Sequence, residues 1–218
     1  PPSIRPFPAS PAPCWRSPDG TTPRVLVKFL FTSEKLSVQV HPDDAYALAH
    51  EGCPGKDEMW LVLAAEPGAR LAAGFREPVS RERARRAALD GEIEQLLQWW
   101  PVTAGQVYYV PAGTVHTLGA GITVCEIQRP SPATYRFYDY GRGRELHLER
   151  ALDVATLDRY PGPSPATGPL LASCPGFSVE KRLVTEAHHR PDARGFQLLV
   201  VLEGVGTLAG EPMNPGQV

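Results

Sequence analysis

Two pairs of polar side chains in the sequence are spaced so that they could act on a common ligand. In LSVQVH, Gln39 and His41 stand two residues apart, and in GKDEMW the same spacing separates Lys56 and Glu58. Residues two apart on a β-strand share one face, so each pair is expected to point to one side of its strand. A solvated strand face usually carries Lys, Glu or Thr. The Ser-Gln-His face of LSVQVH therefore suggests a buried functional surface rather than contact with bulk water.

A third stretch, PAGTVH, supplies a second histidine. Its proline and glycine predict a tight turn between two strands, and the turn delivers His116 from the second of them. Together with Gln39, His41 and Glu58, this residue completes a set of two imidazoles, a carboxylate and an amide oxygen. Such a set suits a borderline divalent ion such as zinc and leaves positions open for water or substrate. The alternative is that the four are separate hydrogen-bonded polar residues.

Short strands are the predominant elements around these residues, because alternating or continuous apolar runs are bounded by turn residues. Strands are predicted over residues 25–30, 35–41, 57–66, from 70 onward, within 105–128, and at 134–142, 177–186 and 196–210. Helices are predicted at 43–52 and 145–157, and as two short helices within 80–100 that Gly91 separates. The arginines near the start of that last segment suggest a solvated helix face rather than an anion site.

Composition excludes several classes of protein. The chain has 218 residues, 42% hydrophobic and 21% charged, with a net charge of −2, so nothing favours nucleic acid or an anionic membrane as a partner. No apolar run approaches the roughly 20 residues of a membrane span. The four cysteines are widely spaced without a CxxC pair, which is typical of reduced thiols. We therefore expect a cytoplasmic protein.

An internal sequence similarity suggests that the chain contains two related modules. WLVLAAEPGARLAAG followed by AGQVYYVPAG resembles LLVVLEGVGTLAG followed by PGQV, where the sequence stops in what should be a strand. We expect a mainly β fold of tandem jelly-roll barrels with a few short helices, the second barrel incomplete in this sequence. The expected divisions are a proline-rich arm (1–23), a catalytic domain with a helical insertion (24–160), a linker (161–169) and a partial second domain (170–218).

Several motifs resemble known families. The spacing of Gly105, Pro111, Gly113 and His116 resembles the second motif of the cupin superfamily, in which that histidine is usually a metal ligand. LSVQVHPDDAYA, GKDEMWLVL, VPAGTVHTLGAG and EIQRPSPATYRFYDYGR together resemble the type I phosphomannose isomerases in their short bacterial form. The resemblance is strong over residues 24–157 and weak elsewhere.

This resemblance implies a zinc-dependent isomerase that interconverts mannose 6-phosphate and fructose 6-phosphate through an enediolate, with one zinc ion per chain. The residues that it matches to zinc ligands are Gln39, His41, Glu58 and His116, of which Gln39 is the least certain. It also implies catalytic roles for Arg136, Glu126 and Lys56, with Glu126 as the preferred proton-transferring base. Ser37 and Lys28 match positions that hold the phosphate end of the sugar, with ordinary structural roles as the alternative.

Other functions remain compatible with the sequence. A non-catalytic metal- or sugar-binding cupin would bind without turnover, and a different cupin isomerase would act on another sugar. The TYRFYDYGR motif favours the phosphomannose isomerase. The expected partner is a small phosphorylated sugar, and the expected assembly is a monomer or a homodimer.

Overall fold

Short strands joined by glycine and proline turns make up most of the computed structural model, which describes residues 24–164, 168–187 and 196–216. The described residues form two compact units, one that runs to Arg182 and one that begins at Leu183. In the first unit the strands are β1 (Leu26–Thr32), β2 (Val38–Val40), β3 (Glu58–Ala65), β4 (Arg70–Phe75), β5 (Leu97–Pro101), β6 (Val107–Val110), β7 (His116–Leu118), β8 (Ile122–Gln128), β9 (Tyr135–Tyr138), β10 (Leu170–Ser173) and β11 (Ser178–Glu180). The second unit contains the hairpin of β12 (Gly206–Leu208) and β13 (Glu211–Met213).

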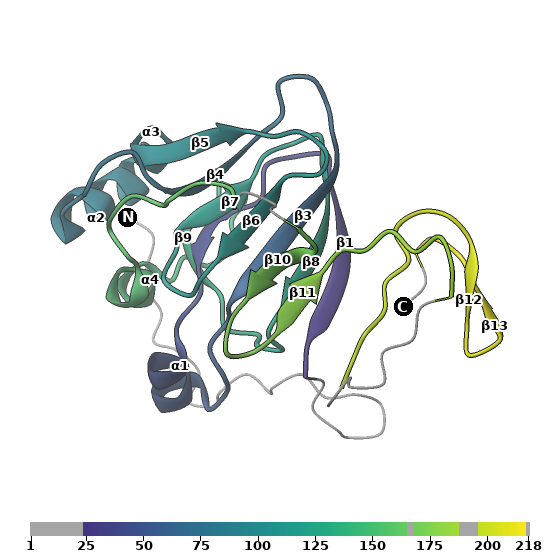
Figure 1. Ribbon diagram of the computed structural model, residues 1–218. Helices are drawn as coiled ribbons and strands as arrows, with labels where there is room; N and C mark the ends of the chain where they lie inside the picture. Colours follow the sequence, from purple (N-terminus) through teal and green to yellow (C-terminus); the bar gives the residue numbers. More distant parts are fainter. Residues whose placement is uncertain (1–23, 165–167, 188–195, 217–218) are drawn as a thin grey trace. The chain divides into compact units, whose positions relative to one another are not determined.

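Two antiparallel sheets form the barrel of the first unit (Figure 1). One has the strand order β1-β8-β3-β6 and the other β5-β4-β7-β2-β9. A core of apolar side chains from both sheets fills the space between them, including Trp60 and Val62 from one sheet and Leu71 and Leu118 from the other. The sequence prediction of a mainly β jelly-roll barrel is confirmed.

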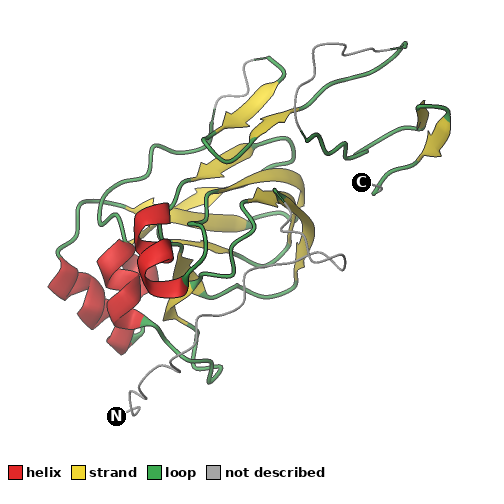
Figure 2. Ribbon diagram, turned by 90° about the horizontal axis from the view of Figure 1, so that it is seen from below, coloured by secondary structure: helices red, strands yellow, loops and turns green. Residues whose placement is uncertain are grey.

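Helices cover the outer face of the five-stranded sheet. They are α1 (Asp44–Glu51), α2 (Arg81–Asp90), α3 (Ile93–Leu96) and α4 (Leu148–Val154), and they gather on one side of the barrel (Figure 2). A second apolar cluster joins Val38 and Phe137 of the sheet to Ala84 of α2 and Leu152 of α4. The molecule therefore has three layers here. In β2, the buried Val38 and Val40 face the helices and the half-buried Gln39 faces the barrel interior.

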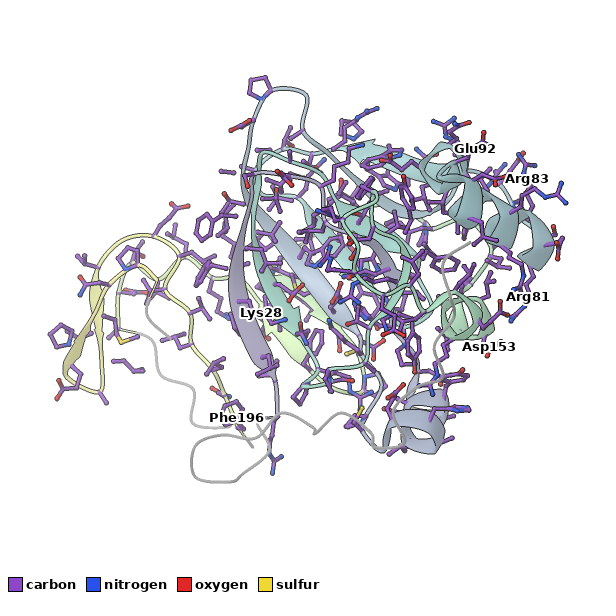
Figure 3. The ribbon with its side chains drawn as sticks, turned by 180° about the vertical axis from the view of Figure 1, so that it is seen from behind. Lys28, Arg81, Arg83, Glu92, Asp153 and Phe196 are labelled. Atoms are coloured by element: carbon purple, nitrogen blue, oxygen red, sulfur yellow. The ribbon has the colours of Figure 1, made fainter. Side chains whose placement is uncertain are left out.

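Local signals in the sequence set the ends of two helices. Asp43 caps α1 by accepting a hydrogen bond from the amide of Tyr46, and Gly52 ends the helix with a left-handed backbone. Ser80 and Gly91 bound α2 in the same way, as the sequence predicts. Two arginines of α2 reach α4: Arg81 forms an ion pair of 2.7 Å with Asp153 (Figure 3), and Arg85 pairs with Glu149.

Three predicted elements differ from the structure. The run LQWW is predicted as helix but forms part of β5, because it pairs with β4 as the edge strand of the five-stranded sheet and its tryptophans pack against that sheet. The strand predicted at 177–186 extends only over β11, and residues 196–205 are described outside any strand. The predicted arm at 1–23 and part of the linker lie outside the described residues, and the expected domain boundaries stay predictions. Within the described residues, no helix is long and apolar enough to cross a membrane.

Candidate metal centre and active site

Three of the predicted metal ligands meet inside the barrel. His41 directly follows β2, Glu58 begins β3, and His116 begins β7. Their ligand atoms all lie within 4.8 Å of one another, and the three side chains are 1–2% exposed. The Nε2 atoms of His41 and His116 lie 3.4 and 3.3 Å from the two carboxylate oxygens of Glu58. The two sheets thus contribute to one buried group, His41 and His116 from the five-stranded sheet and Glu58 from the four-stranded one.

Hydrogen bonds fix the orientation of both imidazoles. The Nδ1 atom of His41 lies 3.0 Å from the carbonyl oxygen of Ala133, and that of His116 lies 2.8 Å from the carbonyl oxygen of Thr114. A carbonyl oxygen can only accept, so each Nδ1 carries the hydrogen and each Nε2 presents a lone pair to the centre. This second interaction is typical of histidines that bind metals.

The protonation states also suit a cation. Burial lowers the pKa of His41 to about 3, helped by Lys56, and burial likewise lowers the pKa of His116. For Glu58, burial alone would raise the pKa, but the positive charge of Lys56 acts in the opposite direction and the pKa lies well below its ordinary value. At neutral pH the group therefore consists of two neutral imidazoles and one carboxylate, the forms that coordinate metal ions.

Two of these three residues, His41 and Glu58, have buried acceptors without a hydrogen-bond partner. Nε2 of His41 and both carboxylate oxygens of Glu58 have no hydrogen-bond partner of acceptable geometry. Buried polar atoms are normally satisfied, because each unsatisfied one costs about 1–3 kcal/mol. The only cationic side chain near Glu58 among the described residues is Lys56, with Nζ at 3.4 Å. A divalent cation between the acceptors fits this arrangement.

Gln39 lies beside this group, on the strand next to His116. It pairs with His116 in the register of β2 and β7, and its amide nitrogen lies 3.3 Å from Nε2 of His116. Its amide oxygen accepts a hydrogen bond of 3.3 Å from the buried hydroxyl of Ser37. For Gln39 to contribute an oxygen ligand, its side-chain amide has to flip, so that the oxygen rather than the nitrogen faces the metal group. Its role as a ligand stays a prediction.

A residue that sequence reasoning missed links the two metal-ligand segments. Asp57 stands between Lys56 and Glu58, and its carboxylate accepts hydrogen bonds from the amide of Ala112 at 3.1 Å and the hydroxyl of Tyr109 at 3.3 Å. Ala112 belongs to the turn that leads to His116. The only available signal was an acidic residue at a strand start, and its partner lies 55 positions away.

Glu126 lies on β8, and both oxygens of its carboxylate accept hydrogen bonds. Lys28 of β1 donates to Oε2 at 2.8 Å, and the indole nitrogen of Trp60 donates to Oε1 at 3.2 Å. Lys28 also donates to the side-chain oxygen of Gln128. Figure 3 shows Lys28 on β1, at the edge of the four-stranded sheet. The structure thus brings Lys28 to Glu126, while Ser37 lies beside Gln39.

Arg136 lies on the barrel-facing side of β9, opposite Gln39 in the strand register. One of its Nη atoms donates to the carbonyl oxygen of Glu145 at 3.4 Å, and its buried Nε has no hydrogen-bond partner. Across three strands, His116, Gln39 and Arg136 therefore form one row that faces the barrel interior. An unsatisfied guanidinium nitrogen there is available to an anionic or oxygen-rich ligand.

Comparisons with known proteins find relatives in sequence and in structure. No model of a protein family matches the chain. Mannose-6-phosphate isomerase of Streptococcus mutans is 40% identical over 197 residues, which cover 84% of this chain and 62% of that protein. Mannose-6-phosphate isomerase ManA of Bacillus subtilis is 34% identical over 207 residues, 88% of this chain and 65% of that protein. Over most of its own length, the chain is therefore similar in sequence to mannose-6-phosphate isomerases.

A solved structure of one such isomerase shares the fold. The crystal structure of mannose 6-phosphate isomerase from Bacillus subtilis matches with a TM-score of 0.63 and 35% identity, over 71% of this chain and 54% of that one. A putative mannosephosphate isomerase from Archaeoglobus fulgidus matches with a TM-score of 0.54 at 24% identity, which supports the fold alone. The chain spans less than two thirds of the length of these curated mannose-6-phosphate isomerases.

Proposed function

We propose that this chain carries the catalytic centre of a zinc-dependent aldose–ketose isomerase that interconverts mannose 6-phosphate and fructose 6-phosphate. The observation that supports it most is the buried group of His41, Glu58 and His116. Its ligand atoms converge, those of His41 and Glu58 have no hydrogen-bond partner, and the group suits one divalent cation. The names and 34–40% identities of the relatives add support for the reaction. Two imidazoles and a carboxylate form a donor set typical of catalytic zinc, with a position left open.

Isomerisation moves one proton between C1 and C2 of the open-chain sugar and a second proton between the oxygens on those carbons. No electron acceptor is needed, because the aldehyde carbon is reduced as its neighbour is oxidised. The carbon-bound proton is only weakly acidic, so the enediolate that forms when it leaves must be stabilised. When bound, a divalent cation supplies Lewis-acid chemistry that lowers the cost of this developing negative charge.

In this proposal Glu126 takes the proton from one carbon and returns it to the other. Its carboxylate is 8% exposed and is held by Lys28 and Trp60, so it is oriented before substrate arrives. Arg136 stabilises the charge that develops on the sugar oxygens, which its unsatisfied buried Nε supports. Lys56 adds positive charge beside Glu58.

The phosphate end of the sugar is assigned to Ser37 and Lys28. Ser37 is buried beside Gln39, and the Lys28 side chain is 38% exposed, so its ammonium group is accessible to a phosphate. A phosphate held at a distance from the reacting carbons supplies binding energy that positions them.

The test combines metal analysis with a coupled assay for fructose 6-phosphate formed from mannose 6-phosphate. We expect about one zinc per chain and turnover. Glu126→Gln should retain zinc and lose at least about 100-fold in kcat, the range of a general base. Zinc-loaded protein that binds mannose 6-phosphate without turning it over would instead support a non-catalytic binding module. Wild-type rates in Glu126→Gln would remove that residue from the mechanism.

A further inference from the structure

One buried side chain contacts both the candidate metal group and the candidate base. Trp60 of β3 is 2% exposed, and its indole nitrogen donates to Oε1 of Glu126 at 3.2 Å. The same ring meets the imidazole of His116 edge to face, with ring centroids 5.4 Å apart. The sequence analysis places Trp60 only within the strand predicted over residues 57–66.

The register of the four-stranded sheet explains this placement. Lys28, Glu126, Trp60 and Tyr108 are direct cross-strand partners on β1, β8, β3 and β6. Direct partners in antiparallel strands point to the same face, so the row faces the barrel interior. Glu126 therefore has a cation on one side and an indole on the other.

The two donors to Glu126 differ in rigidity. Lys28 has a flexible four-carbon stem, and its side chain is 38% exposed. Trp60 has only two side-chain torsions, and its ring is packed in the barrel core. A hydrogen bond from a fixed indole N–H determines how the Glu126 carboxylate is rotated. A mobile ammonium group instead adjusts its own position to whatever rotation the carboxylate adopts.

We propose that Trp60 is a positioning residue for proton transfer: its indole N–H holds the Glu126 carboxylate in one rotation, while its ring packs against the His116 imidazole and keeps it in place. This inference rests on the proposed function and deepens it. A proton moved between two adjacent carbons requires a carboxylate that faces both, and a misplacement of about 1 Å can cost about 100-fold in rate.

The test replaces Trp60 with 3-benzothienylalanine, which exchanges the indole N–H for sulfur and preserves the two-ring shape. We expect kcat on mannose 6-phosphate to fall at least about tenfold, the size expected for one hydrogen bond to a charged group. KM should stay within about twofold and zinc content should be unchanged. In an enzyme that already carries Glu126→Ala, the same replacement should cause no further loss, because the acceptor is gone.

Trp100 provides the matched control. Its indole N–H donates to the carbonyl oxygen of Ala73 at 3.2 Å, on β4 of the other sheet. The same replacement there also removes one indole hydrogen bond but should leave kcat within about twofold. An equal fall in kcat at both positions would assign the effect to stability and overturn the proposal. So would unchanged kcat after replacement at Trp60, or an equal further loss in the Glu126→Ala background.

A second measurement separates this inference from the proposed function. If the zinc-loaded wild-type protein does not turn over mannose 6-phosphate, the proposed function fails on that result alone. The contact itself is read by the proton resonance of the Trp60 indole N–H, which a carboxylate acceptor shifts downfield. Glu126→Ala should move this resonance upfield and speed its exchange with water, and no change would overturn the contact.

Discussion

At the scale of single residues, Glu58 has the most demanding environment among the predicted ligands. It is 1% exposed, and two neutral imidazoles turn lone pairs toward it while Lys56 approaches one oxygen at 3.4 Å. A buried carboxylate costs several kcal/mol unless charges or hydrogen bonds compensate it. Its ionised form is held by Lys56, with a cation expected to complete the compensation.

Glu58→Gln should therefore lose the metal rather than only slow the reaction. The variant removes the negative charge between His41 and His116, so we expect metal affinity to fall by more than about 100-fold, beyond the 10–100-fold typical of residues that only support ligands. Metal analysis after dialysis against a chelator series measures this. Glu34→Gln, at an exposed site, is the charge-matched control. Full zinc occupancy in Glu58→Gln at the affinity of the wild-type protein would contradict the assignment.

Asp139 gives a pH-dependent prediction away from the metal group. Its carboxylate, 3% exposed, accepts hydrogen bonds from Arg144 and Arg142, and these arginines lower its pKa from 3.8. Because the folded pKa is the lower one, the stabilisation is present above about pH 4 and is lost as the pH falls through the folded pKa. Asp139→Asn should cost about 1–2 kcal/mol of unfolding free energy at pH 7, discounted because both arginines are partly exposed.

Urea unfolding at a series of pH values measures this difference. The gap between the wild-type protein and Asp139→Asn should shrink toward pH 3, while Asp90→Asn, at an exposed helix end, should change little at any pH. A gap that stays constant from pH 7 to pH 3 would show that the charge of Asp139 contributes nothing.

At the scale of elements, the turn before β7 holds two parts of the centre together. The amide of Gly113 donates to the carbonyl oxygen of His41 at 2.8 Å, and its own carbonyl oxygen accepts from the amide of Thr156 at 2.8 Å. Its φ angle is +88°, and a Cβ atom there would lie 2.8 Å from Oγ1 of Thr156. Glycine is required here both for the backbone conformation and for space.

Gly113→Ala should lower stability by about 1–2 kcal/mol more than Gly105→Ala, because overpacking adds to backbone strain. Gly105 is a close control, since its φ angle is +89° and nothing lies within 4 Å of its Cβ position. Because the amide of Gly113 donates a hydrogen bond to the carbonyl oxygen of His41, metal affinity should also fall in Gly113→Ala but not in Gly105→Ala. Denaturant unfolding and metal titration give the two measurements, and equal costs at the two glycines would refute the packing argument.

Periodicity and cap residues in the sequence were sufficient to predict many of the strands and helices. Alternation in LSVQVH and spacing in GKDEMW correctly indicated which side chains share a face, and Asp43 and Gly52 marked the ends of α1. The run LQWW was misread because Leu96, Leu97 and the tryptophans also fit a helical spacing, and only pairing with β4 decides between the two. Contacts across strands, such as Trp60 with Glu126, depend on register between segments 66 positions apart, which local sequence patterns do not contain.

At the scale of the whole molecule, the two units differ in how much apolar surface they bury. The barrel unit has fully buried side chains such as Tyr108 and Phe137, whereas Leu183 is 91% exposed and Val205 84% exposed in the second unit. The described part of the second unit has one short hairpin, and every residue of β12 is exposed. Stability within one chain follows local burial and hydrogen bonding.

Hydrogen exchange measured on the whole chain should therefore show two regimes. We expect amides in residues 196–216 to exchange more than about 100-fold faster than those of β3 and β8, which lie inside the four-stranded sheet. Bound zinc should slow exchange further in the barrel but not in residues 196–216. Equal protection of the two regions would show that the second unit is as stable as the barrel.

The brevity of β2 has a consequence for how this sequence can diverge. All three residues of β2 pair with β9, and Gln39 also pairs with His116 of β7, so that it is in register with both His116 and Arg136. A one-residue deletion or insertion inside this strand would move core side chains to the pocket face and pocket side chains to the core face, since successive side chains of a strand point to opposite faces. The turn at Gly68 has open space around it and can absorb changes of length. Libraries that vary loop length should therefore be directed at the turn at Gly68. In β2, only substitutions that keep the number of residues are expected to be tolerated.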